Sequence, residues 1–103
     1  LDAARASGAR GVVVAAMGRG NVPPEMVPGI ERCVAAGVPV VVASRAGRGH
    51  VGRTYAYPGG GRRLHDLGAI FAGKRRPQQA RLELMLALGA GLDGAALRAL
   101  FEA

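Results

Sequence analysis

The chain has 103 residues, enough for one domain whose core is thin, because a domain of this size buries roughly two-thirds of its unfolded surface. Its net charge is +7 and 13 of its 14 basic residues are arginine, yet no zinc-ligand spacing and no basic helix with interleaved aromatics accompanies the charge. We therefore expect no nucleic-acid binding. The absence of a signal peptide and of a long apolar run predicts a cytoplasmic protein without membrane contact.

The first half of the chain alternates helical and strand patterns. Residues 1–8 predict a short helix, and the β-branched apolar run 11–17 predicts a strand that is buried on both faces. Residues 24–36 predict a helix, because a proline opens the stretch and a glycine follows it, although Pro28 allows a later start. Residues 38–44 predict a second buried strand.

The second half begins with a long segment, 45–66, which is rich in Gly and Arg, lacks a sustained period and is predicted to be a loop. A third short strand is expected at 68–73. Residues 77–88 predict a strong helix that is apolar nearly all round, so we expect it to be buried. Asp93 is placed to cap a last helix over 94–102.

This order predicts an α/β fold: a small three-layer, Rossmann-like domain over residues 1–103 with a mostly parallel sheet of three strands. Ligands in such folds bind beyond the carboxyl ends of the strands. In this chain those ends lead into residues 18–21 and 44–53.

Residues suited to covalent chemistry are few. A Ser44–His50–Asp66 triad can be written down, but its spacing matches no known arrangement, and both His50 and His65 are expected to be exposed loop residues. No metal-ligand spacing is present, so neither a metal nor a cofactor is expected. Cys33 is interpreted as a small buried apolar residue. The basic cluster 74–76 precedes a helix start, where the helix dipole disfavours positive charge, so an ion pair or an interface is expected there.

The turn Gly18-Arg19-Gly20-Asn21 joins a strand to a helix, where free backbone N–H groups favour an anion. It matches neither a dinucleotide-binding fingerprint nor a P-loop, because Pro23 follows closely and the P-loop lysine is missing. Two interpretations stay open. Asn21 orients a small carboxylate or amide ligand, or the glycines simply form a tight turn and Asn21 caps the next segment.

Three segments together resemble the C-terminal domain of bacterial-type L-asparaginases, in order and over nearly the whole chain: GVVVAAMGRGNVPPEM, AAGVPVVVASRAGRGHV and GAIFAGKRRPQQARLELMLALG. The resemblance is carried by the GxGN turn, the pair Ser44-Arg45 and the PQxAR helix start. It implies an amidohydrolase that converts L-asparagine to L-aspartate and ammonia, some members also accepting glutamine.

The resemblance also implies how the work is divided. The threonine nucleophiles and their Lys and Asp helpers lie in a larger N-terminal domain, so no catalytic residue is expected in this chain. The C-terminal domain joins a homo-oligomer, a dimer or tetramer, and leans over a neighbouring subunit's active site. It supplies the Asn of the GxGN turn, which is Asn21 here, with Gly18 and Gly20 shaping the substrate-binding turn.

Two departures from the family pattern are visible. The acidic residue that the long loop often contributes falls near Gly61, and no carboxylate occurs between Glu31 and Asp66, which leaves Asp66 as a substitute. The resemblance also implies a strand before the first helix, and we expect that strand to be missing here. An exposed sheet edge would follow, so we expect lower stability or self-association. A non-catalytic small-ligand-binding or regulatory module that kept the fold is the alternative function.

Overall fold

The centre of the fold is a short parallel sheet that follows the β-branched runs of the sequence. The computed structural model describes residues 1–16, 22–45 and 61–102. Its strands are β1 (Val12–Ala16), β2 (Val40–Ser44) and β3 (Ile70–Phe71), in the order β1-β2-β3 with both pairs parallel. Every residue of β2 is buried, as expected for a central strand covered on both faces. The predicted three-stranded parallel sheet is confirmed, with shorter strands than expected.

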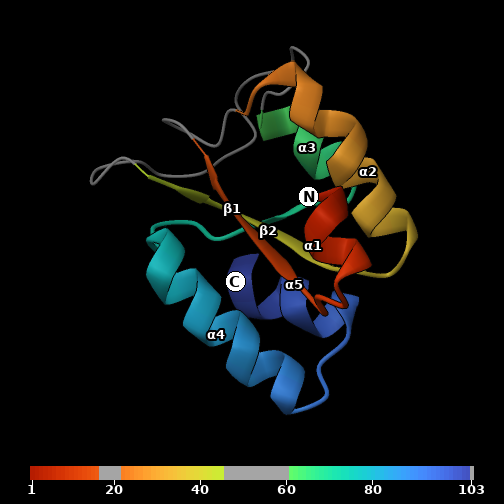
Figure 1. Ribbon diagram of the computed structural model, residues 1–103. Helices are drawn as coiled ribbons and strands as arrows, with labels where there is room; N and C mark the ends of the chain where they lie inside the picture. The colour runs from red at the N-terminus through yellow and green to blue at the C-terminus, as the bar shows by residue number, and fades with distance from the viewer. Residues whose placement is uncertain (17–21, 46–60, 103) are drawn as a thin grey trace.

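Helices cover both faces of this sheet and make the domain three-layered (Figure 1). One face carries α1 (Asp2–Ala6), α2 (Val27–Ala35) and α3 (Gly61–Asp66). Their contribution to the core on this side centres on Ile30, Cys33 and Leu64, all fully buried. The buried position of Cys33 confirms that it packs as a small apolar residue.

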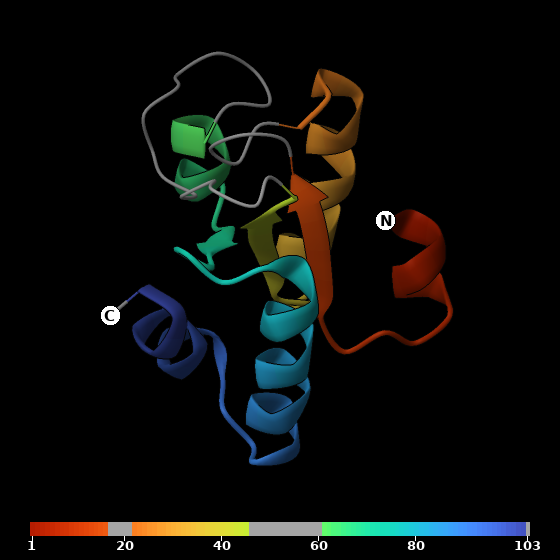
Figure 2. The same cartoon turned by 90° about the vertical axis from the view of Figure 1, so that its left-hand side faces the viewer.

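The other face carries α4 (Pro77–Gly89) and α5 (Gly94–Glu102), which Figure 2 shows side by side. Both helices begin where the sequence predicted. Pro77 occupies the first turn of α4, and Asp93 Oδ1 accepts a hydrogen bond of 3.1 Å from the backbone N–H of Ala96. The caps confirm that local chemistry sets these boundaries.

Two expectations about helices were wrong, and a third had left two starting points open. The segment 45–66 is not a loop throughout, because its last six residues form α3. The second helix begins at Val27, next to the later start that Pro28 allowed, after a 3-10 turn, η1 (Pro24–Met26). The helix α4 is not buried all round: it packs on β1 and β2 through one face, and several large apolar side chains of its other face are exposed. A three-stranded sheet covers only one side of a helix that lies on it.

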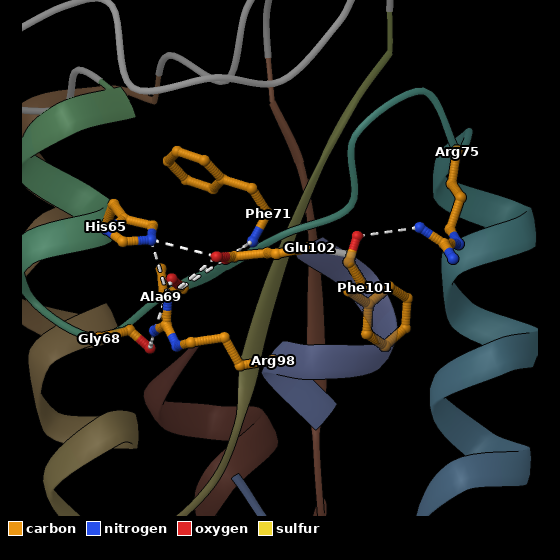
Figure 3. Close-up of polar contacts among 8 residues, drawn as sticks. All are labelled: His65, Gly68, Ala69, Phe71, Arg75, Arg98, Phe101 and Glu102. Carbon is orange, nitrogen blue, oxygen red and sulfur yellow. Dashed lines mark hydrogen bonds and ion pairs between the residues drawn. The ribbon is translucent and has the colours of Figure 1, made fainter. Parts of the chain in front are cut away.

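The outer edge of β3 is closed by α5, as Figure 3 shows. The backbone N–H of Phe71 points away from β2 and donates to Glu102 Oε2 at 2.8 Å. Arg98 Nη2 donates to the carbonyl oxygens of Gly68 and Ala69 at 3.1 and 3.2 Å. Side chains of the last helix therefore bond three backbone groups at an edge that would otherwise be open to another strand.

The outer edge of β1 is different. Among the described residues no strand pairs with it, and it borders a groove of about 550 Å³ between β1 and α4. The groove is lined by Arg10, Gly11, Val13, Arg81, Leu84, Met85, Leu88 and Gly89. The strand that the resemblance adds before α1 would pair at this edge, and this stays a prediction.

The basic cluster 74–76 also has its expected partner. Arg75 Nε donates to Glu83 Oε2 at 2.6 Å, and the guanidinium carbon of Arg75 lies 5.0 Å from the centre of the Phe101 ring. The cation thereby ties the start of α4 to the end of α5, which confirms the expected ion pair for this residue of the cluster.

Candidate functional site

The ends of β1 and β2 form the carboxyl edge at which a ligand site is expected. Ala16 and Ser44 are paired in register as the last residues of the two strands. The backbone N–H of Arg45 donates to the carbonyl oxygen of Ala16 at 2.8 Å, so the pairing continues one residue beyond the strand ends. Ser44 is buried, with 3% exposure, whereas Arg45 is exposed. The two strands are therefore hydrogen-bonded to each other as far as Arg45, where the predicted ligand segments lead away from the sheet.

The predicted substrate-binding residues Asn21, Gly20 and Gly18 lie outside the described residues. Their flanks are described and are fixed. Ala16, before the turn, and Val22, after it, are 2% and 4% exposed and belong to the same apolar cluster. Both ends of the predicted turn are thus anchored in the core beneath the carboxyl edge.

A small hollow of about 210 Å³ opens beside these anchors. It is lined by Val14, Ala15, Ala16, Val22, Pro23, Met26 and Arg45. Small-molecule sites that enclose a ligand measure about 300–1,000 Å³. The described residues therefore form one wall of a site, apolar except for the Arg45 guanidinium, rather than an enclosed pocket.

The nucleophile candidates do not meet in the part of the chain that the structure describes. Ser44 is buried at the end of β2, and Cys33 is buried in α2. Asp66 ends α3 and leads toward the amino end of β3, away from the carboxyl edge, so the Ser44–Asp66 part of the written triad does not assemble. For the same reason Asp66 is badly placed to replace the missing acid, whereas Gly61 is the first residue of α3. His50 lies outside the described residues.

His65 corrects another expectation, because it is not an exposed loop residue. It belongs to α3, and its side chain is 21% exposed. Its Nε2 atom lies 2.8 Å from Arg98 Nη1 and 3.2 Å from Glu102 Oε1, and its ring centre lies 5.5 Å from that of Phe71 (Figure 3). These contacts hold α3, β3 and α5 together, so His65 has a structural role on this side of the sheet.

Sequence reasoning missed this cluster, although one local signal was present. Arg98 and Glu102 stand four residues apart in α5, a spacing at which opposite charges meet on a helix, and their ion pair measures 3.2 Å. The partners of this pair in α3 and β3 lie about thirty or more positions away in sequence, where spacing gives no guide. Within the described ranges, no group of three or more His, Cys, Asp or Glu side chains is placed to hold a metal ion. No described helix is both long and apolar enough to cross a membrane.

Comparison with known proteins agrees with this architecture. The model of the family described as the Glutaminase/Asparaginase C-terminal domain matches residues 1–101. The chain is 41% identical over 93 residues to a probable L-asparaginase of Deinococcus radiodurans; the aligned region is 90% of this chain and 28% of that protein. It is 35% identical over 94 residues to an L-asparaginase of Bacillus licheniformis; the aligned region is 91% of this chain and 29% of that protein.

Among solved structures, L-asparaginase I from Vibrio cholerae superposes with a TM-score of 0.76. The match covers 93% of this chain and 29% of that one, at 24% sequence identity, and shows a shared fold. The chain thus spans less than a third of the length of the relatives it matches.

Proposed function

Because the chain belongs to the glutaminase and asparaginase C-terminal domain family, we propose that it is the C-terminal domain of an L-asparaginase-type amidohydrolase. The assembled enzyme converts L-asparagine to L-aspartate and ammonia. The larger N-terminal domain supplies the nucleophile, and this domain contributes oligomer contacts and substrate positioning. The names of the two curated relatives support the reaction, and the lack of a nucleophile–base pair among the described residues agrees with a supporting role.

One observation supports the positioning role: the hydrogen bond between Arg45 N–H and the Ala16 carbonyl, which joins the ends of β1 and β2 just before the predicted turn with Asn21 begins in the sequence. Strand ends that are bonded to each other restrict the segment attached to them. Holding a substrate in one position lowers the entropic part of the reaction barrier. The carboxamide of Asn21 offers both a donor and an acceptor to a small substrate. In this proposal the Asn21 carboxamide contacts the substrate that is bound to a partner subunit.

The alternative is a non-catalytic small-ligand-binding or regulatory module that kept the fold. It is favoured by one feature of the sequence, the absence of a carboxylate between Glu31 and Asp66, where the resemblance expects an acid near Gly61. Such a module would bind a small ligand without hydrolysing it.

Complementation distinguishes the two functions. Ammonia release from L-asparagine is measured with this chain alone, with an N-terminal asparaginase domain alone, and with both. We expect activity well above background only in the mixture. No activity in a mixture that co-purifies as a complex contradicts the asparaginase role and favours the binding module.

Within an active mixture, Asn21→Ala tests the positioning role directly. Loss of the side-chain hydrogen bonds to the substrate is expected to lower kcat/KM by roughly 10- to 100-fold. Glu25→Ala is the matched control, because Glu25 is exposed in η1, close to the same edge in sequence, and is not part of the proposed site. Turnover that is equal for both variants would remove Asn21 from the proposal.

A further inference from the structure

A hollow of about 420 Å³ lies at the amino edge of the sheet, at the opposite end of the strands from Ala16 and Ser44. Its walls come from the residues that lead into β1 and β2, and from the adjoining turns of α4 and α5 with their connection. We call it the amino-edge hollow. Its volume falls within the range of about 300–1,000 Å³ that is usual for small-molecule sites, unlike the hollow of about 210 Å³ at the carboxyl edge.

Two opposite charges line the amino-edge hollow without being bonded to each other. Arg10 precedes β1, Asp93 precedes α5, and both residues are exposed. Among the described residues, the Arg10 side chain has no hydrogen-bond or ion-pair partner. Asp93 Oδ1 accepts the capping hydrogen bond of 3.1 Å from the Ala96 N–H, and no described residue donates to Oδ2. The hollow therefore offers a guanidinium and a carboxylate oxygen to the same ligand.

Apolar side chains complete the wall of the amino-edge hollow. Leu88 near the end of α4 and Leu92 in the connection pack against the core cluster on this face of the sheet and stay partly exposed. Pro39, just before β2, is half-buried beside them. An apolar ligand group that covers these side chains is stabilised because their surface is removed from water. The hollow thus combines two charged groups with an apolar wall.

We propose that the amino-edge hollow binds a free α-amino acid with an apolar side chain. Arg10 donates to the carboxylate of the ligand, Asp93 accepts from its ammonium group, and the apolar side chain lies against Leu88 and Leu92. This inference adds a binding site to the proposed function and does not depend on amide hydrolysis.

The pair of opposite charges favours a zwitterion over a simple ion. An anion such as acetate pairs with Arg10 but brings a like charge to Asp93, and an amine pairs with Asp93 but brings a like charge to Arg10. An amino acid carries both charged groups on one carbon atom, so each group meets its opposite. Hydrogen bonds between ionised partners are stronger than those between neutral ones.

Titration of the chain with L-leucine, followed by amide NMR spectra, tests the site. We expect saturable shifts that are concentrated around residues 9–10, 37–38 and 92–94 and give one Kd. Isocaproate lacks the ammonium group and L-leucinamide lacks the carboxylate. Because the two protein charges are exposed, each analogue is expected to bind about fivefold more weakly than L-leucine. L-asparagine keeps both charges without the apolar side chain and is also expected to bind more weakly.

Two variants assign each end of the ligand to its partner. Arg10→Gln should weaken L-leucine and isocaproate about fivefold without weakening L-leucinamide. Asp93→Asn should weaken L-leucine and L-leucinamide without weakening isocaproate, and it preserves the start of α5 because asparagine also caps helices. Arg81→Gln is the matched control. Arg81 is an exposed arginine that lines the β1–α4 groove but not the amino-edge hollow, so its loss leaves binding unchanged.

Several results overturn the proposal. One is the lack of saturable shifts, and another is shifts that are centred on other segments. Isocaproate that binds as tightly as L-leucine would show only a simple anion on Arg10. Tighter binding of L-asparagine than of L-leucine, or equal weakening by Arg81→Gln and Arg10→Gln, also contradicts it.

Each variant is first shown to have the circular dichroism spectrum of the unmodified chain. The ligand series on the unmodified chain decides the question if a variant does not fold. None of these measurements uses ammonia release. Failure of the complementation assay therefore contradicts the proposed enzyme activity, whereas failure of the titrations contradicts only the amino-acid site.

Discussion

Replacing Gly68 by alanine is expected to be among the most damaging single-methyl changes in the domain. Gly68 joins α3 to β3 with a φ of +105°, a region that side-chain-bearing residues avoid at a cost of about 1–3 kcal/mol. An added Cβ also lies 2.9 Å from Cγ1 of Val34 in α2. Val34 is β-branched and held in one rotamer by its helix, so the clash adds about 1–3 kcal/mol. The two terms together give an expected loss of about 2–6 kcal/mol, a large share of the stability of a small domain.

Gly37→Ala is the matched control for this change. Gly37 also has a positive φ, +79°, but a Cβ at this position meets nothing within 4 Å, so only the backbone term applies. Urea unfolding, with the slope held in common, gives the free energy of unfolding of both variants. Gly68→Ala is expected to cost at least 1 kcal/mol more, roughly the lower bound of the steric term. Val34→Ala in the Gly68→Ala background should recover part of that difference. Equal losses for the two glycine variants would refute the steric reasoning.

Other predictions concern the last helix and the core. Asp93→Ala removes the hydrogen bond to Ala96 N–H and is expected to lower the free energy of unfolding by about 1 kcal/mol, measured by urea unfolding; an unchanged midpoint would show that the cap is dispensable. Glu102→Ala leaves the Phe71 N–H without its acceptor and should cost about 1–3 kcal/mol, whereas Glu102→Gln keeps an acceptor oxygen and should cost less. Cys33 is fully buried, so a thiol reagent should modify it only as fast as the domain opens, and urea should accelerate the reaction; rapid labelling of the folded chain would contradict the packing.

The strands were predictable from the sequence because burial in the sheet requires a run of consecutive apolar residues. A strand covered on both faces needs apolar residues at every position, and the runs 11–17 and 38–44 have this pattern. Burial on both faces is confirmed for β2 but was wrong for β1, because β1 lies at the open edge of the sheet and Ala15 is exposed. The helix α3 has no comparable apolar pattern in its sequence. It is six residues long, and Leu64 is its one buried residue among those whose side chains are described, so no period can be recognised. The contacts of His65 were hidden for a different reason, because Glu102 is 37 residues away in sequence.

The burial of α4 was overestimated because periodicity reports which positions are apolar and not what covers them. Leu84 and Leu86 are the same residue type, yet Leu84 lies against the sheet and Leu86 points away from it. The candidate site shows a similar limit. The order of strands predicted the edge at which Ala16 and Ser44 end, whereas the role of Asn21 came from the resemblance and requires the complementation assay.

The two outer edges of the sheet differ in whether their backbone groups are already hydrogen-bonded. At β3, Glu102 and Arg98 occupy the backbone groups that another strand would need, whereas β1 keeps its outer groups available among the described residues. At the β3 edge the last helix therefore opposes the addition of another strand, so it protects the sheet against edge-to-edge aggregation as well as supporting the fold.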